Sequence, residues 1–374
     1  MALITDLDSY CEKLREAVNH DCGTHFPDDV TWEAGLFSRC FAEAGYHAEV
    51  VDLGPKAGRG MLATNCPDAK EYDILLSGHL DTVFPRGTAA ARPFRREGMK
   101  AFGPGVADMK DGDLAILWAL TELPKEVRDR VRIAVCLNPD EEFGSLHSEE
   151  WIDSYARRSR FALVFESQTE QGQYCDRRKG ISHIDVFMHG VGAHAGFCPE
   201  KGRSAINAMA SCIQRINALA SENVTVNFGT ISGGTVANAI PEECQARIDV
   251  RFWTNGQWDQ FISAFKAEFE KPFGMDVRAE YDILLVKKPM VLTERIGELK
   301  AIVESAAGDL GIKAGFYASG GISDGNHISQ CGIPVLDSFG PRGYDCHTER
   351  EWLDLSSVRE SVDMLKGIIT KLAH

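Results

Sequence analysis

The sequence lacks any paired-cysteine motif. Its eleven cysteines are odd in number, and no two of them form a C-x-x-C pair. This argues against a disulfide framework and against a zinc site made of thiolates. We therefore expect most of the cysteines to act as small buried hydrophobes.

Long apolar runs are also missing. No stretch reaches the ~18 unbroken apolar residues that a membrane span needs, so we expect no transmembrane helix and no membrane partner. The first eight residues carry acids early and have no basic region, which argues against a signal peptide. The cytoplasm is the location that these absences favour.

Positive charge is scarce. The chain has 40 Lys and Arg against 55 Asp and Glu, with a net charge of −15. Nucleic acid and anionic membranes need a basic surface, so both are disfavoured as partners. An anionic small substrate remains compatible, because a local cluster of Arg or Lys can outweigh the global sign.

The remaining composition is that of a globular protein of 374 residues, long enough for two domains. Apolar, strand-like runs alternate with amphipathic, helix-like segments, which predicts an α/β fold with a mostly parallel sheet covered by helices on both faces. The strands are expected at 47–53, 60–64, 72–77, 131–137, 161–165 and 334–338, and the helices at 6–20, 32–45, 113–123, 148–158, 293–308, 323–331 and 355–372.

The pattern changes over residues 179–289. Segments 181–189 and 244–253 alternate between apolar and polar residues, which is typical of a sheet with one face open. With the intervening helical segments, the order is β-α-β-β-α-β, the ferredoxin-like arrangement. We expect an inserted domain at 179–289 within a discontinuous first domain of residues 1–178 and 290–374.

Chemically reactive side chains follow the buried strands of the first domain. They are His79 and Asp81 after the strand at 72–77, Asp140, Glu141 and Glu142 after 131–137, Glu166 after 161–165, His347 after 334–338, and Asp108 in the glycine-rich loop before the helix at 113. Parallel strands place such loops at one sheet edge, where open α/β sheets bind ligands. So many carboxylates would repel one another unless divalent cations lay among them.

Mixed His and carboxylate ligands suit zinc, with cobalt or manganese as substitutes. Few ligands are available for two separate sites, but they suffice if one carboxylate and a water bridge two ions ~3.5–4 Å apart. The adjacent Glu141 and Glu142 should point in different directions. One can then bind metal while the other stays free as a general base.

Five motifs carry a family resemblance. They are Ser77-Gly-His-Leu-Asp-Thr-Val, Gly103-Pro-Gly-Val-Ala-Asp-Met-Lys, Asp140-Glu-Glu-Phe-Gly-Ser, Gly192-Ala-His-Ala-Gly and Cys346-His-Thr. Together and in this order, they resemble the zinc metallopeptidase family of glutamate carboxypeptidase, acetylornithine deacetylase, succinyl-diaminopimelate desuccinylase and aminoacylase. The match runs from about residue 10 to the C-terminus and is most similar to glutamate carboxypeptidase.

The resemblance implies a zinc-exopeptidase catalytic domain whose metal ligands are His79, Asp108, Glu142, Glu166 and His347. His79, Asp108 and Glu166 would hold one zinc, and Asp108, Glu142 and His347 the other, with Asp108 bridging. Asp81 would orient His79, and Glu141 would be the general base.

The inserted domain is implied to be a lid and the surface of a homodimer. His194 would reach across the dimer to stabilise an oxyanion, and Asn238 and Arg251 would bind the substrate carboxylate. Two residues depart from the family pattern. Asp111 stands where a glycine is usual, and Lys288 stands where glutamate carboxypeptidases have an arginine.

These features predict a di-zinc amidohydrolase or exopeptidase that releases an amino acid from a small peptide or N-acyl substrate, with carboxypeptidase activity favoured. An N-acyl-amino-acid deacylase is the alternative within this class. A non-catalytic metal- or metabolite-binding relative is the alternative outside it, but such a protein has no need of a free base such as Glu141.

Overall fold

The computed structural model describes residues 3–374, which divide into two compact units. The first unit contains the chain up to Arg177, together with Leu292–Ser319 and Ser323–His374. The second contains Arg178–Val291 and Gly320–Ile322. The expected boundaries at 179 and 289 differ from this division by one and two residues. The expected division also placed Gly320–Ile322 in the first domain, whereas the structure places them in the second unit.

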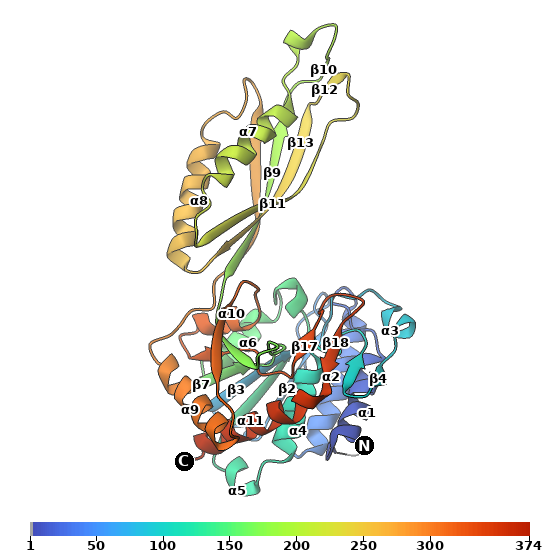
Figure 1. Cartoon of the computed structure of the whole chain (residues 1–374), viewed down its shortest axis with the longest axis vertical. Coiled ribbons are helices and arrows are strands. Elements are labelled where there is room, and N and C mark those ends of the chain that lie inside the picture. The colour runs from blue at the N-terminus through green and yellow to red at the C-terminus, as the bar shows by residue number, and fades with distance from the viewer. Residues whose placement is uncertain (1–2) are drawn as a thin grey trace. The chain divides into compact units, whose positions relative to one another are not determined.

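A six-stranded sheet forms the centre of the first unit (Figure 1). In spatial order its strands are β1 (His47–Asp52), β2 (Arg59–Thr64), β6 (Ile133–Asn138), β3 (Tyr72–His79), β7 (Ser159–Val164) and β16 (Val335–Leu336). From β6 to β16 neighbouring strands run parallel, whereas β1 and β2 are antiparallel. The prediction of a mostly parallel α/β sheet is confirmed.

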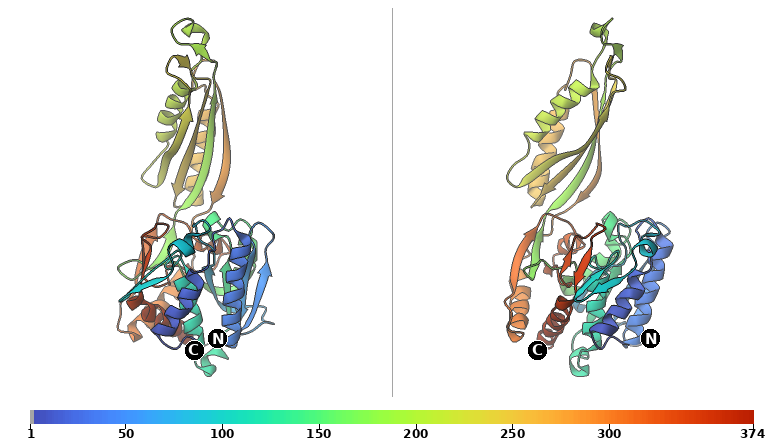
Figure 2. Two further views of the ribbon diagram at one scale, coloured as in Figure 1. Left: turned by 90° about the vertical axis from the view of Figure 1, so that its right-hand side faces the viewer. Right: turned by 45° about the vertical axis from the view of Figure 1, so that its right-hand side comes forward.

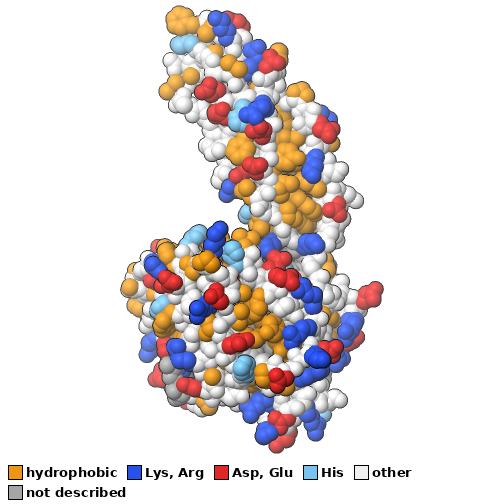
Figure 3. All heavy atoms as spheres, turned by 180° about the vertical axis from the view of Figure 1, so that it is seen from behind, with side chains coloured by type: hydrophobic (Ala, Val, Ile, Leu, Met, Phe, Trp, Pro, Cys, Tyr) orange, Lys and Arg blue, Asp and Glu red, His pale blue; other side chains and the backbone are white. Residues whose placement is uncertain are grey.

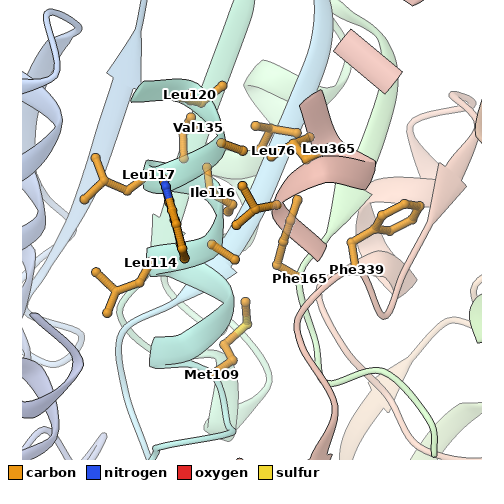
Figure 4. Packing of buried hydrophobic residues seen from close by; sticks show 14 of the residues in the cluster. Leu76, Met109, Leu114, Ile116, Leu117, Leu120, Val135, Phe165, Phe339 and Leu365 are labelled. Atoms are coloured by element: carbon orange, nitrogen blue, oxygen red, sulfur yellow. The ribbon is translucent and has the colours of Figure 1, made fainter. Parts of the chain in front are cut away.

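Helices cover both faces of this sheet (Figure 2). On one face lie α1 (Leu7–Val18), α2 (Pro27–Glu43), α4 (Lys110–Thr121), α9 (Ile296–Asp309) and α11 (Val358–Leu372), and on the other lie α6 (Glu149–Ala156) and α10 (Gly325–Gln330); α3 (Thr88–Ala91) and α5 (Lys125–Arg128) are short. Figure 4 shows Ile116 and Leu120 of α4 on the side of Leu76 of β3 and Leu365 of α11, whereas Leu114 and Leu117 point to the opposite side of the helix. This apolar packing holds the strand ends in fixed positions.

Several features of the first unit differ from the pattern of the sequence, among them a two-stranded sheet of β8 (Gln173–Arg178) and β15 (Gly315–Ser319) that was not predicted. Helix α2 begins at Pro27, several residues before the expected start at 32, because proline suits the first helical position and Asp28 and Asp29 suit the first turn. A small sheet was also not predicted. It pairs β17 (Gly343–Tyr344), β18 (Trp352–Asp354), β5 (Lys100–Phe102) and β4 (Arg95–Glu97), strands too short to show a period.

The second unit is a four-stranded antiparallel sheet with two helices on one face (Figure 2). Its elements are, in chain order, β9 (Gly180–His189), α7 (Ala205–Asn217), β11 (Val224–Gly233), β13 (Glu243–Phe252), α8 (Asn255–Phe269) and β14 (Arg278–Lys287). The spatial order β11-β13-β9-β14 confirms the predicted ferredoxin-like fold. A two-stranded ladder, β10 (Ala193–His194) with β12 (Ala239–Ile240), extends from it.

Within residues 3–374, no helix is long and apolar enough to cross a membrane. The eleven cysteines are free thiols and most are buried, as expected.

Candidate metal centre

Two histidines converge on Asp108 in the first unit. His79 is the last residue of β3 and is 1% exposed, and its Nε2 lies 3.1 Å from Oδ1 of Asp108. His347 lies in the loop between β17 and β18, and its Nε2 is 2.9 Å from Oδ2 of the same residue. Each oxygen of Asp108 therefore faces one imidazole, which is the position that a bridging ligand takes.

Three glutamates complete the cluster. Oε2 of Glu142 is 3.2 Å from Nε2 of His347, and Oε1 of Glu166 is 3.8 Å from Nε2 of His79. Glu141 has a carboxylate oxygen within 4.8 Å of ligand atoms of His79 and Glu166. The residues that the sequence singled out at the strand ends thus lie together, although which of them bind metal stays a prediction.

The donor set fits divalent cations. Asp108, Glu141, Glu142 and Glu166 bring four carboxylates together against two imidazoles. Oε1 of Glu142 is buried and has no hydrogen-bond partner in the described chain, which is costly unless another positive group meets it. Oxygen and imidazole ligands in this combination suit zinc, cobalt or manganese.

The ionisation of these groups reflects their crowding. Burial raises the pKa of Asp108, but hydrogen bonds with His347 and His79 outweigh burial and hold that pKa below its usual range. Hydrogen bonds with Asp108 and Glu142 raise the pKa of His347 to about 10. Burial, and then the nearby Glu166, raise the pKa of Glu141 well above its usual value. A cation that binds here must therefore displace protons from the histidines.

Asp81 organises two parts of the site. Its backbone carbonyl accepts a hydrogen bond from Nδ1 of His79 at 3.0 Å, which leaves Nε2 of that ring as the free ligand atom. Its carboxylate accepts the backbone N–H groups of Glu141 and Glu142, both at 3.1 Å, and the hydroxyl of Thr24 at 2.6 Å. One buried carboxylate therefore fixes the turn that presents both glutamates. The sequence pattern suggested only the contact with His79.

Glu351 supports the loop of Asp108 in the same way. This buried side chain accepts hydrogen bonds from the backbone N–H groups of Gly105, Ala107 and Asp108 at 2.9–3.2 Å. Sequence reasoning missed Glu351, since it lies far from the loop in the chain and directly precedes β18 of the small sheet that was not predicted.

A second buried network lies behind the Glu141–Glu142 turn. Asp324, 2% exposed, accepts hydrogen bonds from Asn138 at 2.8 and 2.9 Å and from Ser145 at 2.5 Å. His327 bridges it to Asp153, with ring nitrogens 3.0 and 2.6 Å from the two carboxylates. The sequence left Asp324 as a helix cap or a substrate-side residue, but its side chain makes no capping hydrogen bond.

His194 and Asn238 lie side by side in the second unit. Both are exposed, and β10 pairs with β12 so that His194 faces Ala239. Nδ1 of His194 accepts the backbone N–H groups of Gly196 and Phe197 at 3.1 and 3.2 Å. The neutral ring must therefore carry its proton on Nε2, where it can donate to a ligand. A cavity of about 790 Å³ borders both residues.

Arg251 lies at the opposite end of the second unit, on the four-stranded sheet. Strand β13 runs from Glu243, near the cavity, to Phe252, so Arg251 is separated from the cavity by most of its length. Its guanidinium donates to both carboxylate oxygens of Asp249 at 2.8 and 3.0 Å and to the carbonyl of Gly320 at 3.3 Å. Lys288 follows β14 at this end. The three predicted substrate residues are therefore not gathered at one place in the second unit.

A comparison with protein families identifies the chain. The model of "Peptidase family M20/M25/M40" matches residues 75–371, which include every residue of the metal cluster. The chain belongs to peptidase family M20/M25/M40. The resemblance inferred from the five motifs is confirmed.

Relatives of the M20/M25/M40 chain act as peptidases and as deacylases. Carboxypeptidase G2 of Pseudomonas sp. (strain RS-16) is 31% identical over 313 residues, covering 80% of this chain and 74% of the relative. Succinyl-diaminopimelate desuccinylase of Ruegeria pomeroyi is 25% identical over 357 residues, covering 87% and 89%. A solved tripeptidase from Staphylococcus aureus shares the fold, with a TM-score of 0.80, 20% identity and coverage of 98% and 99%.

Membership of the M20/M25/M40 family makes the chain a hydrolytic enzyme of metallopeptidase type and implies a divalent metal at the His and carboxylate cluster. Asp111, which departs from the family pattern, is buried in the first turn of α4. Burial raises the pKa of its carboxyl well above the usual value. This departure therefore places an acid that favours its protonated form three residues along the chain from Asp108.

Proposed function

We propose that the chain is a di-zinc amidohydrolase that cleaves a peptide or N-acyl amide bond and releases an amino acid, as a glutamate carboxypeptidase does. The observation that carries this proposal is the position of Asp108 between two imidazoles, with Glu141 beside the same cluster. A bridging carboxylate with a separate glutamate nearby suits two metal ions and a general base.

His79, Asp108 and Glu166 would hold one ion, and Asp108, Glu142 and His347 the other. Zinc fits this donor set, and cobalt or manganese are substitutes. When bound, the ions would supply a water of lowered pKa and polarise the carbonyl of the substrate. The orphaned Oε1 of Glu142 supports a ligand role for this residue.

Glu141 would take the proton of the attacking water and return it to the leaving amine. Its backbone N–H is fixed by Asp81, so its position is set by a rigid contact. Burial and Glu166 raise its pKa, which favours the protonated form that the second half of the reaction needs.

His194 would donate a hydrogen bond from Nε2 to the oxyanion, and Asn238 and Arg251 would bind the carboxylate of the released amino acid. Since these groups lie at opposite ends of the second unit, a single small substrate can meet all of them only if a second copy of the chain contributes one end. This supports the proposed homodimer.

The second unit has exposed apolar surface that suits such a partner. Edge strand β14 exposes Ile283, Leu284 and Val286, and Figure 3 shows hydrophobic side chains gathered on the surface of this unit. An edge strand with apolar side chains is a template for pairing with another chain.

Carboxypeptidase activity is favoured over deacylation because the relative that is 31% identical is a carboxypeptidase. The comparison with a desuccinylase keeps N-acyl-amino-acid deacylation as the alternative. Lys288 supplies a cation at the end of the sheet that holds Arg251, but it lacks the planar fork with which arginine grips a carboxylate. The preference for a C-terminal glutamate is therefore the open part of the proposal.

The test combines metal analysis with a substrate panel. We expect two zinc ions per chain, and hydrolysis of acyl-glutamates, dipeptides or acetyl-amino acids that a chelator abolishes. Glu141→Ala should keep both ions and lose roughly two or more orders of magnitude in turnover. Near-normal turnover in this variant, or two bound ions with no amide cleaved by the wild type, would contradict the proposal.

A further inference from the structure

Two aromatic rings stand directly beside the turn that carries Glu141. Thr24 and Glu142 both donate to Oδ2 of Asp81, at 2.6 and 3.1 Å. The next residues along the chain are His25 and Phe143, whose ring centroids are 4.3 Å apart with planes tilted by 58°. The contact between these rings is therefore anchored on both sides by the carboxylate that positions the two glutamates.

Val83 extends this surface. Gly23 and Thr82 form a parallel bridge, and the N–H of Thr24 donates to the carbonyl of Thr82 at 3.1 Å. The register therefore places Val83 beside Thr24, the residue that precedes His25. Phe143 and Val83 are each 45% exposed, whereas Thr24, Asp81 and Thr82 are buried. We name His25, Val83 and Phe143 the apolar wall.

Large apolar side chains are exposed here next to a cluster of ionised groups, although exposing apolar surface to water is unfavourable. Phe143 is the last residue of the short 3-10 helix that contains both Glu141 and Glu142. Its main chain is consequently held as firmly as that of the base. A rigid, half-exposed ring at this distance along the chain is suited to contact a group attached to the carbonyl under attack.

We propose that the apolar wall binds the acyl part of the substrate and selects an aromatic or large apolar group there. This inference rests on the proposed function. The wall contains no Lys or Arg, and its most exposed surface, that of Val83 and Phe143, is apolar, so it suits the carboxylate of the released amino acid less well than Arg251 and Asn238, which are proposed to bind it. The uncharged acyl side is the part that gains from contact with the rings.

The experiment compares two substrates that release the same amino acid, one with an N-benzoyl and one with an N-acetyl group, using the zinc-loaded enzyme. Phe143→Ala should lower kcat/KM for the benzoyl substrate roughly tenfold and leave the acetyl substrate within about twofold, because only the larger group reaches the wall. Phe143→Leu should lie between the wild type and the alanine variant. His25→Ala provides a second exposed variant with the same expected direction.

Trp32 is a matched control. It is 38% exposed and stacks on His20 with ring centroids 3.8 Å apart, so it is another exposed aromatic on a histidine in the same unit. Trp32→Leu should leave the ratio of the two substrates unchanged.

Three results would overturn the apolar wall. They are an equal loss for both acyl groups, an unchanged ratio in both the Phe143 and His25 variants, and a selectivity change that follows the released amino acid instead of the acyl group. Failure of the proposed function looks different, because the wild-type enzyme would then hydrolyse neither substrate with zinc bound.

Discussion

The two units place their functional groups in contrasting ways. In the first, parallel strands end at one edge, and the loops that follow bring His79, Asp108 and Glu142 within hydrogen-bond distance of their neighbours. In the second, antiparallel strands carry Arg251 at one end of the unit, and the β10–β12 ladder carries His194 at the other. One unit therefore concentrates its chemistry, and the other separates its candidate substrate contacts.

The first unit of a single chain contains all residues of the metal cluster, whereas the second unit of a single chain does not bring the candidate substrate residues together. The metal cluster needs only residues of the first unit, so metal binding should be a property of the single chain. Under the proposed function, recognition of the substrate by both ends of the second unit would require two copies. Substitutions should therefore be able to impair substrate recognition without impairing metal binding, and the reverse.

The largest expected effect comes from combining a substitution at one end of the second unit with a substitution at its other end. His194→Ala removes an oxyanion donor and should lower kcat about 10²–10³-fold, and Arg251→Ala should raise KM at least about tenfold. A hybrid dimer with one defect in each copy keeps one intact combination of ends. We expect this hybrid, isolated with two affinity tags, to recover about half of the wild-type activity per dimer.

The matched control pairs two defects at the same end. A hybrid of His194→Ala with Asn238→Ala damages both composite sites and should recover nothing. If the hybrid of His194→Ala with Arg251→Ala stays as inactive as its parents, both ends act within one copy, and the shared site is wrong.

A smaller effect tests how the first unit holds its ligands. Asn in place of Asp81 keeps the size but only one acceptor oxygen, and its NH₂ group would face an N–H or the hydroxyl of Thr24. Asp81→Asn should therefore weaken zinc binding by about 10–100-fold, measured by competition with a chelator.

Asp73 provides the control for this substitution. It lies on β3, the strand that leads into Asp81, and also accepts several hydrogen bonds, from the backbone and guanidinium of Arg132, but away from the cluster. Asp73→Asn should leave zinc affinity unchanged. Equal zinc affinities for the two variants would remove Asp81 from the support of the site.

The metal cluster was largely predictable because it follows a rule of sheet topology. Most candidate ligands end or closely follow a buried apolar strand or precede a helix, and parallel strands deliver such positions to one edge; His347 follows β16 only after a longer loop that contains β17. The alternating pattern of 181–189 and 244–253 was equally informative, since it distinguishes a half-covered antiparallel sheet from a buried parallel one. Local periodicity is what both inferences share.

The supporting residues could not be found in this way. Thr24 meets Asp81 across 57 residues, and Glu351 meets Gly105 across 246. No local period marks such pairs, because the geometry depends on how whole elements pack. The contact of Arg251 with Asp249 was missed for a different reason, since Asp249 is only two residues away on the same strand face and was interpreted only as part of the polar alternation.

The smallest expected effect is on stability and concerns His327, which is buried between Asp153 and Asp324. Burial lowers its pKa, but hydrogen bonds with both carboxylates outweigh burial and raise it to about 9. Because this folded pKa exceeds the ~6.5 of an unfolded histidine, the stabilisation is fully present below pH ~6.5. It is lost as pH rises toward about 9. The shift corresponds to on the order of 3 kcal/mol.

His327→Gln should therefore be less stable than the wild type at pH 6 by more than it is at pH 9.5, as measured by urea unfolding. His20 tests the sign. Burial lowers the pKa of His20, so this side chain has already lost its charge below pH 6.5 in the folded protein. The difference in stability between the wild type and His20→Gln should therefore not narrow between pH 6.5 and 9.5. A stability difference between the wild type and His327→Gln that is constant with pH would mean that the ring of His327 is neutral in the folded state. The network behind Glu141 and Glu142 would then be held by hydrogen bonds alone, without the charge that couples α10 to α6.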